Sequence, residues 1–238
     1  MNKNSEVILI IPSYNEAGNI ERVVDELISD YPQFDYVVVT DGPTDGTDEI
    51  CRNRGYNTVF LPENLGLTLC FRHGMQYAWE HGYEYAVQFD GDGQHRPEYI
   101  ASMVEAAKNG ADLVQGSRFL KLPGEEKPEK PLKGMRSLGS VLLRRWIRLR
   151  TGVRVTDPTC GLRLYGRKLI DAFANHDSYA PEPDTIARLL RQKVAYSEVP
   201  VRVAERESGS SYLRPGRAVA YMWRMMKAIL WEKPSKNG

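Results

Sequence analysis

The sequence predicts an α/β fold with a mostly parallel, Rossmann-like sheet and helices on both faces. Three observations support this class. Hydrophobic residues make up 42% of the 238 residues, which is enough for a sizeable core and excludes a largely disordered chain. Short apolar runs alternate with segments of helical spacing over the first 119 residues. Polar motifs follow several of these runs, at the strand ends where ligands bind in such sheets.

The expected elements can be placed in order along the chain. Strands are expected at 6–11, 36–40, 58–61, 85–89, 112–115 and 194–203, where apolar and β-branched residues dominate. Helices are expected at 20–28, 45–54, 67–81, 98–109, 138–150, 166–175, 183–192 and 215–231, where apolar residues recur at helical spacing. Helical crossovers between strands imply parallel neighbours. Since no clean linker interrupts the chain, we expect a single domain over 1–238.

Charge is divided unevenly along this nearly neutral chain. The 32 Lys and Arg and the 31 Asp and Glu give a formal net charge of +1. Residues 1–119 hold eight basic and 19 acidic residues, a net of −11, whereas 120–238 hold 24 and 12, a net of +12. This asymmetry indicates that the two halves face different partners. Acidic groups suit a metal or sugar hydroxyls, and basic groups suit phosphates, nucleic acid or an anionic membrane.

The cysteines and the hydropathy of the chain bear on its location. Cys51, Cys70 and Cys160 are odd in number and match no zinc-binding spacing, which favours free thiols in a reducing compartment. The apolar run near the N-terminus is shorter than a signal peptide requires. No segment reaches the roughly 18 apolar residues of a membrane span. We therefore expect a cytoplasmic protein that meets a membrane only by lying on its surface.

The turn Asp90-Gly91-Asp92 carries the most chemistry. Its two carboxylates follow an expected strand directly, and Gln94 and His95 add further polar ligands or donors in the same turn. A cation such as Mg²⁺ is usually held by one or two carboxylates together with substrate phosphates. The alternative is a solvated turn, because Asp-Gly is a common turn dipeptide.

Two other acidic residues also follow expected strands. Asp41 ends an apolar run and can accept a hydrogen bond from a nucleobase or a ribose hydroxyl. Glu16 follows the first strand, although it can equally be a favourable acid in the first turn of a helix. Thr44 and Asp45 are better explained as residues of a turn and a helix cap. The sequence has no glycine-rich phosphate loop, so phosphates are expected to be neutralised by a cation and by basic residues of the second half.

Seven motifs in a fixed order give the sequence a family resemblance. They are IIPSYNEAGNI, TDGPTDGT, ENLGL, FDGDGQHRPE, GSRF, DPTCGLRLY and EVPVRVAERESGSS, and they extend from about Val7 to Tyr212. With these motifs the sequence resembles glycosyltransferase family 2, in particular the dolichyl-phosphate mannose synthases and other polyprenyl-phosphate sugar transferases. The resemblance implies a GT-A fold, with 1–119 as the nucleotide- and metal-binding half and 120–238 as the acceptor half.

The resemblance also implies roles for individual residues. Nucleotide binding is implied for Pro12, Tyr14, Glu16, Asp41 and Asp90. A metal ion, Mg²⁺ or Mn²⁺, is implied at Asp90, Asp92 and Gln94, and Asp92 is also expected among the catalytic residues. Contact with the acceptor or its phosphate is implied for Arg118, Arg136, Ser140 and Arg206. The donor implied is a nucleotide-diphosphate sugar, linked to either GDP or UDP.

The acceptor decides whether the reaction needs a general base. A phosphate monoester is largely ionised at neutral pH, because its second pKa is about 6. A polyprenyl phosphate positioned by arginines can therefore attack without a base, whereas a hydroxyl on a glycan or cell-wall polymer requires a carboxylate. Glu182 and Asp184 are candidates for that base, although acids are also common at helix starts. Asp157 is a further catalytic candidate, and its alternative role is to cap the turn at Pro158.

The basic half indicates the remaining partners. The expected helix at 138–150 has several arginines and no acid, so it presents either a solvated charged face or a docking face for an anionic membrane. We expect peripheral association with the cytoplasmic face of a membrane. A separate small membrane partner can replace the C-terminal membrane helices that many relatives carry.

Nucleic acid is not expected as a partner, because the first half is acidic and no RNA- or DNA-binding motif is present. The intact Asp90–Asp92 pair argues against an inactive scaffold.

Overall fold

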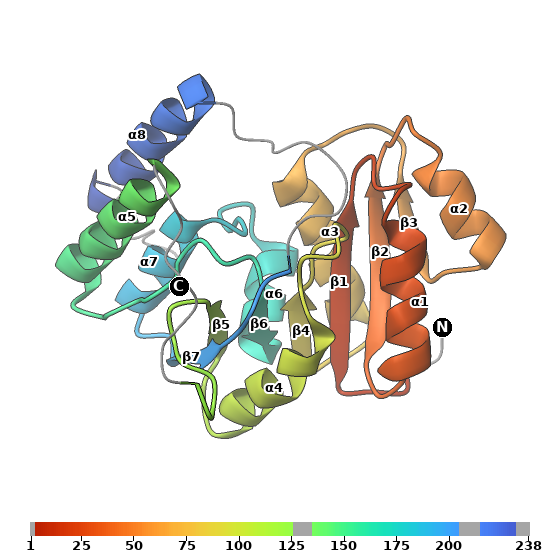
Figure 1. Ribbon diagram of the computed structural model, residues 1–238, viewed down its shortest axis with the longest axis horizontal. Coiled ribbons are helices and arrows are strands. Elements are labelled where there is room, and N and C mark those ends of the chain that lie inside the picture. The colour runs from red at the N-terminus through yellow and green to blue at the C-terminus, as the bar shows by residue number, and fades with distance from the viewer. Residues whose placement is uncertain (1–2, 126–134, 205–214, 232–238) are drawn as a thin grey trace.

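The computed structural model describes residues 3–125, 135–204 and 215–231, and the side chains of 3–125, 139–204 and 223–231. Seven strands form one sheet in the order β3-β2-β1-β4-β6-β5-β7 (Figure 1). They are β1 (Val7–Ser13), β2 (Asp35–Asp41), β3 (Thr58–Leu61), β4 (Tyr85–Gln88), β5 (Leu113–Ser117), β6 (Arg163–Gly166) and β7 (Tyr196–Pro200). The predicted α/β class is confirmed, and the sheet draws strands from both halves of the chain.

The sequence did not predict β6, which lies in the DPTCGLRLY motif. Its four residues are all buried, so they show no alternation of apolar and polar positions. It runs antiparallel to β4 and β5, whereas the other neighbouring pairs are parallel. Because of this direction β6 begins at the edge where β4 and β5 end, with Arg163 beside Gln88 and Gln115. The loop before β6 therefore lies at the same edge of the sheet as the Asp90–Asp92 turn.

The helices lie close to the predicted positions. They are α1 (Ile20–Asp30), α2 (Thr47–Arg54), α3 (Leu67–Glu80), α4 (Ile100–Lys108), α5 (Met135–Thr151), α6 (Arg167–Asn175), α7 (Pro183–Arg191) and α8 (Pro215–Trp231). A short 3₁₀ turn, Pro97–Tyr99, precedes α4. None of the helices in the described ranges is long and apolar enough to cross a membrane.

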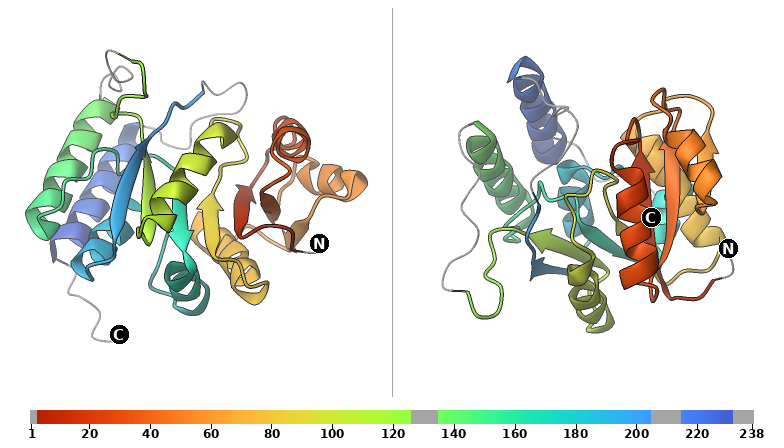
Figure 2. Two further views of the ribbon diagram at one scale, coloured as in Figure 1. Left: turned by 90° about the horizontal axis from the view of Figure 1, so that it is seen from below. Right: turned by 45° about the vertical axis from the view of Figure 1, so that its right-hand side comes forward.

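Two hydrophobic clusters form on opposite faces of the sheet, as the period-two alternation along β1 requires. Leu9 and Ile11 belong to the cluster that includes residues of α1, α2 and α4. Ile8 and Ile10 belong to the cluster that includes residues of α3 and α6. Helices therefore cover both faces of the sheet (Figure 2). This burial fixes the strand ends, and with them the loops that carry the polar motifs.

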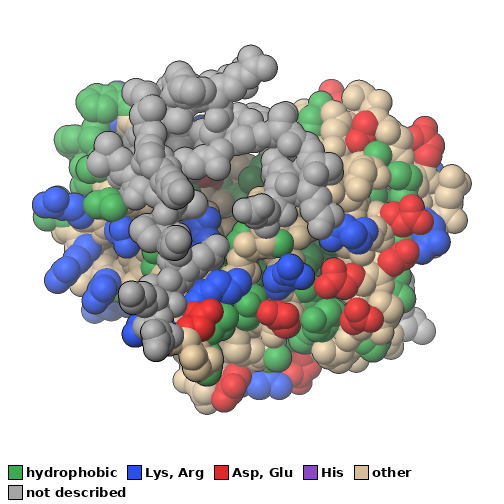
Figure 3. Space-filling view, in the orientation of Figure 1, with side chains coloured by type: hydrophobic (Ala, Val, Ile, Leu, Met, Phe, Trp, Pro, Cys, Tyr) green, Lys and Arg blue, Asp and Glu red, His purple; other side chains and the backbone are tan. Residues whose placement is uncertain are grey.

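A third cluster joins α5, α7 and α8 beside the sheet (Figures 1 and 2). Its buried residues are Leu143, Ile147, Val155, Ile186, Ala187, Leu190, Met225 and Ile229. Three large apolar side chains on α5 and α8 are exposed instead: Leu149 at 78%, Trp223 at 58% and Trp231 at 67%. Exposed Arg145, Arg148 and Arg150 lie on α5, and Lys and Arg side chains gather at that edge of the molecule in Figure 3. The two halves thus differ in surface charge as well as in sequence.

Candidate active site

The loops after β1 and β2 are hydrogen-bonded to each other at the carboxyl edge of the sheet. Asn15, which has a left-handed φ of 57°, accepts a hydrogen bond from the Thr44 amide at 2.8 Å. The Asp45 carboxylate accepts from the amides of Ala17 and Thr47. Burial raises the pKa of Asp45, but the bonds from Thr47 and Ala17 outweigh it and leave that pKa below its usual range. These bonds make the two loops one structural unit.

Three of the predicted nucleotide-binding residues lie near the end of β1, with Pro12 inside the strand and Tyr14 and Glu16 on the loop that follows it. Tyr14 is 46% exposed, and Pro12 and Glu16 are half-buried. The Glu16 carboxylate accepts a hydrogen bond from the Asn19 amide group at 2.7 Å. The structure thus brings these residues to the surface at the strand end, where a nucleotide can reach them.

Asp41, at the end of β2, is only 3% exposed. Its two carboxylate oxygens accept hydrogen bonds from the backbone amides of Leu65 and Gly66, at 2.8 and 2.9 Å. Asp41 therefore orders the loop that leads into α3. Each carboxylate oxygen can accept more than one hydrogen bond, so this bonding leaves capacity for a ligand.

The Asp90–Asp92 turn packs directly against the end of β1. A Cβ atom on Gly91 would lie 2.8 Å from the Ser13 hydroxyl oxygen, so only glycine permits this approach. The Asp90 side chain is 39% exposed, whereas Asp92 is buried and accepts a hydrogen bond from the Gln94 amide at 3.0 Å. The acidic turn consequently lies next to the end of β1, which leads into the loop with Tyr14 and Glu16.

Gln94 connects this turn to the segment after β7. The side-chain Nε2 of Gln94 donates to the Ala204 backbone carbonyl at 3.1 Å. The backbone carbonyl of Gln94 accepts from the Ala204 amide at 2.9 Å. The donor end of the side chain is therefore engaged with the protein. If Gln94 is a metal ligand, as predicted, the ligand atom is its side-chain carbonyl oxygen.

The acidic turn fits a metal that is shared with a substrate. Within the described ranges no group of three or more His, Cys, Asp and Glu side chains could hold a metal ion. Asp90 and Asp92 offer two carboxylates, and Asp90 is open to solvent. This donor set suits a hard cation such as Mg²⁺ or Mn²⁺ that takes its other ligands from water and a diphosphate.

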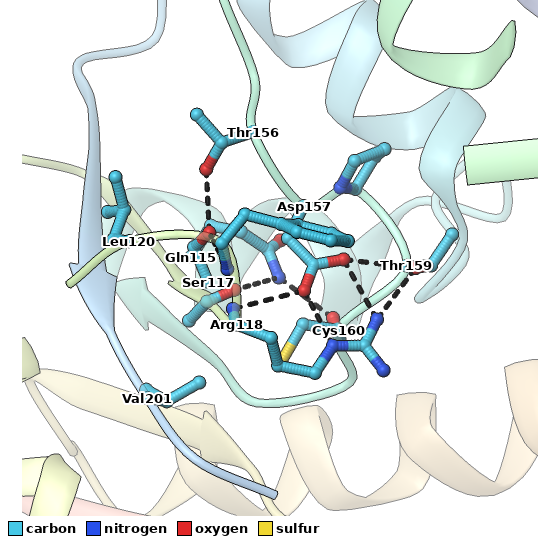
Figure 4. Close-up of polar contacts among 12 residues, drawn as sticks. Gln115, Ser117, Arg118, Leu120, Thr156, Asp157, Thr159, Cys160 and Val201 are labelled. Atoms are coloured by element: carbon cyan, nitrogen blue, oxygen red, sulfur yellow. Dashed lines mark hydrogen bonds and ion pairs between the residues drawn. The ribbon is translucent and has the colours of Figure 1, made fainter. Parts of the chain in front are cut away.

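Arg118 and Asp157, predicted separately for phosphate binding and catalysis, form one buried ion pair (Figure 4). The guanidinium donates from Nε to Oδ2 at 2.7 Å and from Nη2 to Oδ1 at 2.9 Å. Nη2 also donates to the Thr159 hydroxyl. Because Asp157 is fully buried and both its oxygens accept from Arg118, this geometry does not support a direct catalytic role for Asp157. It indicates that the pair positions the loop before β6.

Three further side chains hold the same loop. Gln115 donates to the Cys160 carbonyl at 2.8 Å and accepts from Arg163, which also donates to the Pro158 carbonyl. The carboxylate of Glu198 accepts from the Thr156 amide at 2.8 Å. The segment 156–161 is thus fixed by hydrogen bonds from β5, β6 and β7.

The acceptor-side candidates are only partly within the described structure. Ser140 on α5 is 2% exposed, and its hydroxyl has no hydrogen-bond partner among the described residues. Arg136 lies on α5 where side chains are not described, and Arg206 lies outside the described residues. Glu182 occupies the N-cap position of α7 without a capping hydrogen bond from its side chain, and its Oε1 lies 3.7 Å from Nη2 of Arg224. Asp184, in the first turn of α7, has a buried oxygen without a hydrogen-bond partner in the described ranges.

Gly161 is a site residue that the sequence did not indicate, whereas His95 was expected as a further polar group of the acidic turn. His95 is 6% exposed and contacts Asp90 through both ring nitrogens. A Cβ atom on Gly161 would lie 2.8 Å from Oδ2 of Asp90. The position of His95 within FDGDGQH was a signal for its part in the site, but nothing in the sequence pairs Gly161 with that turn.

A mostly parallel sheet with paired carboxylates at a strand end, next to an open loop, defines this protein as a glycosyltransferase of the GT-A class. The model of glycosyl transferase family 2 matches residues 8–173, and the chain belongs to this family. The predicted family and fold are confirmed.

Two relatives whose names state an activity are similar to this chain over most of their own length. The undecaprenyl-phosphate mannosyltransferase of Micrococcus luteus is 30% identical over 240 residues, covering 95% of this chain and 96% of that protein. The polyprenol monophosphomannose synthase of Mycolicibacterium smegmatis is 29% identical over 86% of this chain and 79% of its own.

A solved structure shares the fold at lower identity. Glucosyl-3-phosphoglycerate synthase from Mycobacterium tuberculosis, in complex with Mn²⁺, uridine diphosphate and phosphoglyceric acid, matches with a TM-score of 0.66 and 19% identity. The match covers 96% of this chain and 80% of that one. At this identity the likeness shows the fold.

Proposed function

We propose that this protein is an inverting glycosyltransferase that moves a sugar from a nucleotide-diphosphate donor to a polyprenyl phosphate at a membrane surface. The observation that carries the proposal is the Asp90–Asp92 turn, packed against the nucleotide-binding loop on one side and the loop before β6 on the other. The polyprenyl-phosphate transferases among the relatives support the acceptor class.

The first half holds the donor in this proposal. Tyr14 and Glu16 lie on the exposed loop at the end of β1. Asp41, at the end of β2, fixes the loop that leads into α3. Asp90 and Asp92 would hold Mg²⁺ or Mn²⁺, and the Mn²⁺ and uridine diphosphate in the solved synthase support a divalent cation with a diphosphate. When bound, the cation stabilises the negative charge that develops on the leaving diphosphate.

The second half orients the acceptor. Its phosphate oxygen displaces the nucleotide diphosphate at the anomeric carbon, and the configuration inverts because the attack comes from the opposite face of the sugar. The phosphate is already ionised near pH 7, since its second pKa is about 6, so positioning replaces proton abstraction. Arg136, Ser140 and Arg206 are assigned to this positioning by their place in the family motifs.

The Arg118–Asp157 pair supports the reaction indirectly. It fixes the loop that touches the acidic turn, so we assign it a positioning role. We propose this positioning role in place of the expected phosphate contact of Arg118 and the expected catalytic role of Asp157.

Membrane docking through α5 and α8 is part of the proposal. Arg145, Arg148 and Arg150 are exposed on α5, and Trp223 and Trp231 are exposed on the neighbouring α8. Cations attract anionic lipid headgroups, and tryptophan is favoured at the membrane interface. We propose that the protein binds the cytoplasmic face in this way, alone or with a small membrane partner.

A second candidate function is transfer to a hydroxyl acceptor. The Asp184 carboxylate favours it, because one of its oxygens has no hydrogen-bond partner in the described structure and a hydroxyl acceptor requires a carboxylate base. Glu182 is the alternative base, although Arg224 lies close to its carboxylate.

One experiment separates these functions. Purified protein is screened by thermal shift against UDP- and GDP-sugars with Mg²⁺ or Mn²⁺, and the stabilising donor is then offered to a polyprenyl phosphate and to the matching polyprenol. Transfer to the phosphate but not to the alcohol supports the first proposal. Transfer to the alcohol that is lost in Asp184→Asn or Glu182→Gln supports the second. If no nucleotide diphosphate or its sugar binds, both are wrong.

A further inference from the structure

His95 is a buried side chain that touches Asp90 at two points. Its Nδ1 accepts a hydrogen bond from the Asp90 backbone amide at 3.0 Å. Its Nε2 lies 3.5 Å from Oδ2 of the Asp90 carboxylate. The ring also packs edge-on against Phe89, with centroids 5.7 Å apart. One imidazole therefore holds both the backbone and the side chain of the first carboxylate in the acidic turn.

The hydrogen bond at Nδ1 assigns the tautomer of this ring. Nδ1 accepts from the Asp90 backbone amide, so the ring N–H that can face the Asp90 carboxylate is the one on Nε2. That N–H faces the carboxylate of Asp90.

Gly161 lies against the contact between His95 and Asp90. A Cβ atom at this position would lie 2.8 Å from Oδ2 of Asp90, and 3.1 and 3.3 Å from Cε1 and Nε2 of His95. The preceding residue is held by the bond from Gln115 to the Cys160 carbonyl, and the following Leu162 carbonyl accepts from the Gly116 amide at 2.9 Å. The backbone at Gly161 cannot move away without breaking these hydrogen bonds. A larger residue at this position would therefore displace Asp90 or His95.

We propose that His95 and Gly161 act together as positioning residues that set the orientation of the Asp90 carboxylate for the divalent cation and the donor diphosphate. The inference rests on the proposed function and names two residues that control the cation affinity of that site. Nδ1 of His95 holds the Asp90 backbone amide while Nε2 faces the Asp90 carboxylate, and the absence of a side chain at Gly161 leaves room for both side chains. Hydrogen-bonded partners of metal ligands typically change metal affinity by about 10- to 100-fold when removed.

The test measures Mn²⁺ binding directly, by calorimetry or by the electron paramagnetic resonance of free Mn²⁺, with the nucleoside diphosphate that the wild type binds. The variants are His95→Asn, His95→Gln and Gly161→Ala. Asn retains an oxygen that can accept from the Asp90 amide, and Gln retains a donor that can reach toward Oδ2. We expect the Kd for Mn²⁺ to rise about 10-fold or more in Gly161→Ala and in at least one His95 variant. At saturating Mn²⁺, kcat should return to within about two-fold of the wild type.

Matched controls separate positioning from packing. His81→Asn changes an exposed histidine on another edge, and Gly166→Ala adds a Cβ whose nearest contact is an ordinary 3.4 Å. Both should leave the Kd for Mn²⁺ unchanged. Thermal unfolding identifies variants that fail to fold, and Gly161→Ala decides the question if the His95 variants do.

The proposal is overturned if folded variants bind Mn²⁺ as the wild type does, or if kcat falls at all Mn²⁺ concentrations with an unchanged Kd. It is also overturned if the wild type binds its nucleotide equally well without Mn²⁺, an outcome that leaves the transferase proposal intact. If the wild type binds no nucleotide at all, the proposed function itself has failed.

Discussion

The guanidinium of Arg118 and the carboxylate of Asp157 form a two-point ion pair, with donor–acceptor distances of 2.7 and 2.9 Å. The pair joins the end of β5 to the loop before β6, 39 residues further along the chain. Asp157 is fully buried, and the Arg118 side chain is 18% exposed. The relationship explains how the GSRF and DPTCGLRLY motifs cooperate: one holds the other against the acidic turn.

Loss of either partner in this pair should destabilise the fold. Arg118→Ala leaves the Asp157 carboxylate buried and unpaired, and we expect the free energy of unfolding to fall by about 3–5 kcal/mol. Urea unfolding measures it. Arg54→Ala is the control, since that ion pair with Asp25 is exposed on both sides and should contribute about 0–1 kcal/mol. Equal effects of the two changes would contradict a structural role for the buried pair.

Asp45 should make the stability of the protein depend on pH in the acid range. Because its folded pKa is below the usual value of 3.8, Asp45 binds protons less readily in the folded state. Its contribution is therefore present above the unfolded pKa and is lost as the pH falls through the folded pKa. Urea unfolding of the wild type and Asp45→Asn should differ most near neutral pH and converge in acid. A difference that grows on acidification would contradict this sign.

The three thiols should be inert in the folded protein. Cys51, Cys70 and Cys160 are all buried, and burial raises the pKa of the Cys70 and Cys160 thiols to about 12. Since the thiolate is the reactive form, a thiol reagent near neutral pH should label none of them until the protein is unfolded. Rapid labelling of the native protein, followed by mass spectrometry, would show that one of them is accessible.

The basic face of α5 should control binding to anionic vesicles. Replacing Arg145, Arg148 and Arg150 together by Gln should weaken binding by roughly 100-fold, at about 1 kcal/mol for each cation near the surface. Co-sedimentation with phosphatidylserine-containing vesicles at low salt measures this. Arg52→Gln, an exposed arginine of the first half, is the control and should have no effect. If the wild type ignores anionic vesicles, direct membrane docking is wrong.

Much of the fold was predictable because it depends on local patterns. Apolar runs marked the parallel strands, and helical spacing marked the helices, including α5 and α8. Strand β6 was missed, since four buried residues with Arg163 at their start give neither alternation nor an apolar run. Its antiparallel placement depends on pairing with β4 and β5, which lie far from it in the chain.

The residues of the candidate site likewise divide into those that the sequence indicated and those that only the structure showed. The Asp90–Asp92 turn and the loop with Tyr14 and Glu16 were visible in the sequence, because each polar group directly follows an apolar strand. The partners of Arg118 and of His95 were not, since those contacts depend on how separate loops meet at the sheet edge.

The sequence by itself determined the α/β class, the family and the acidic turn, because each is written in contiguous residues or in ordered motifs. It also divided the charge into an acidic and a basic half. Only the tertiary structure decided that Arg118 pairs with Asp157 and that Gly161 meets Asp90. Both contacts are created by the antiparallel insertion of β6, which brings a distant loop to the end of β4. Short-range patterns carry no record of such a pairing, because its free energy comes from burial shared between distant segments.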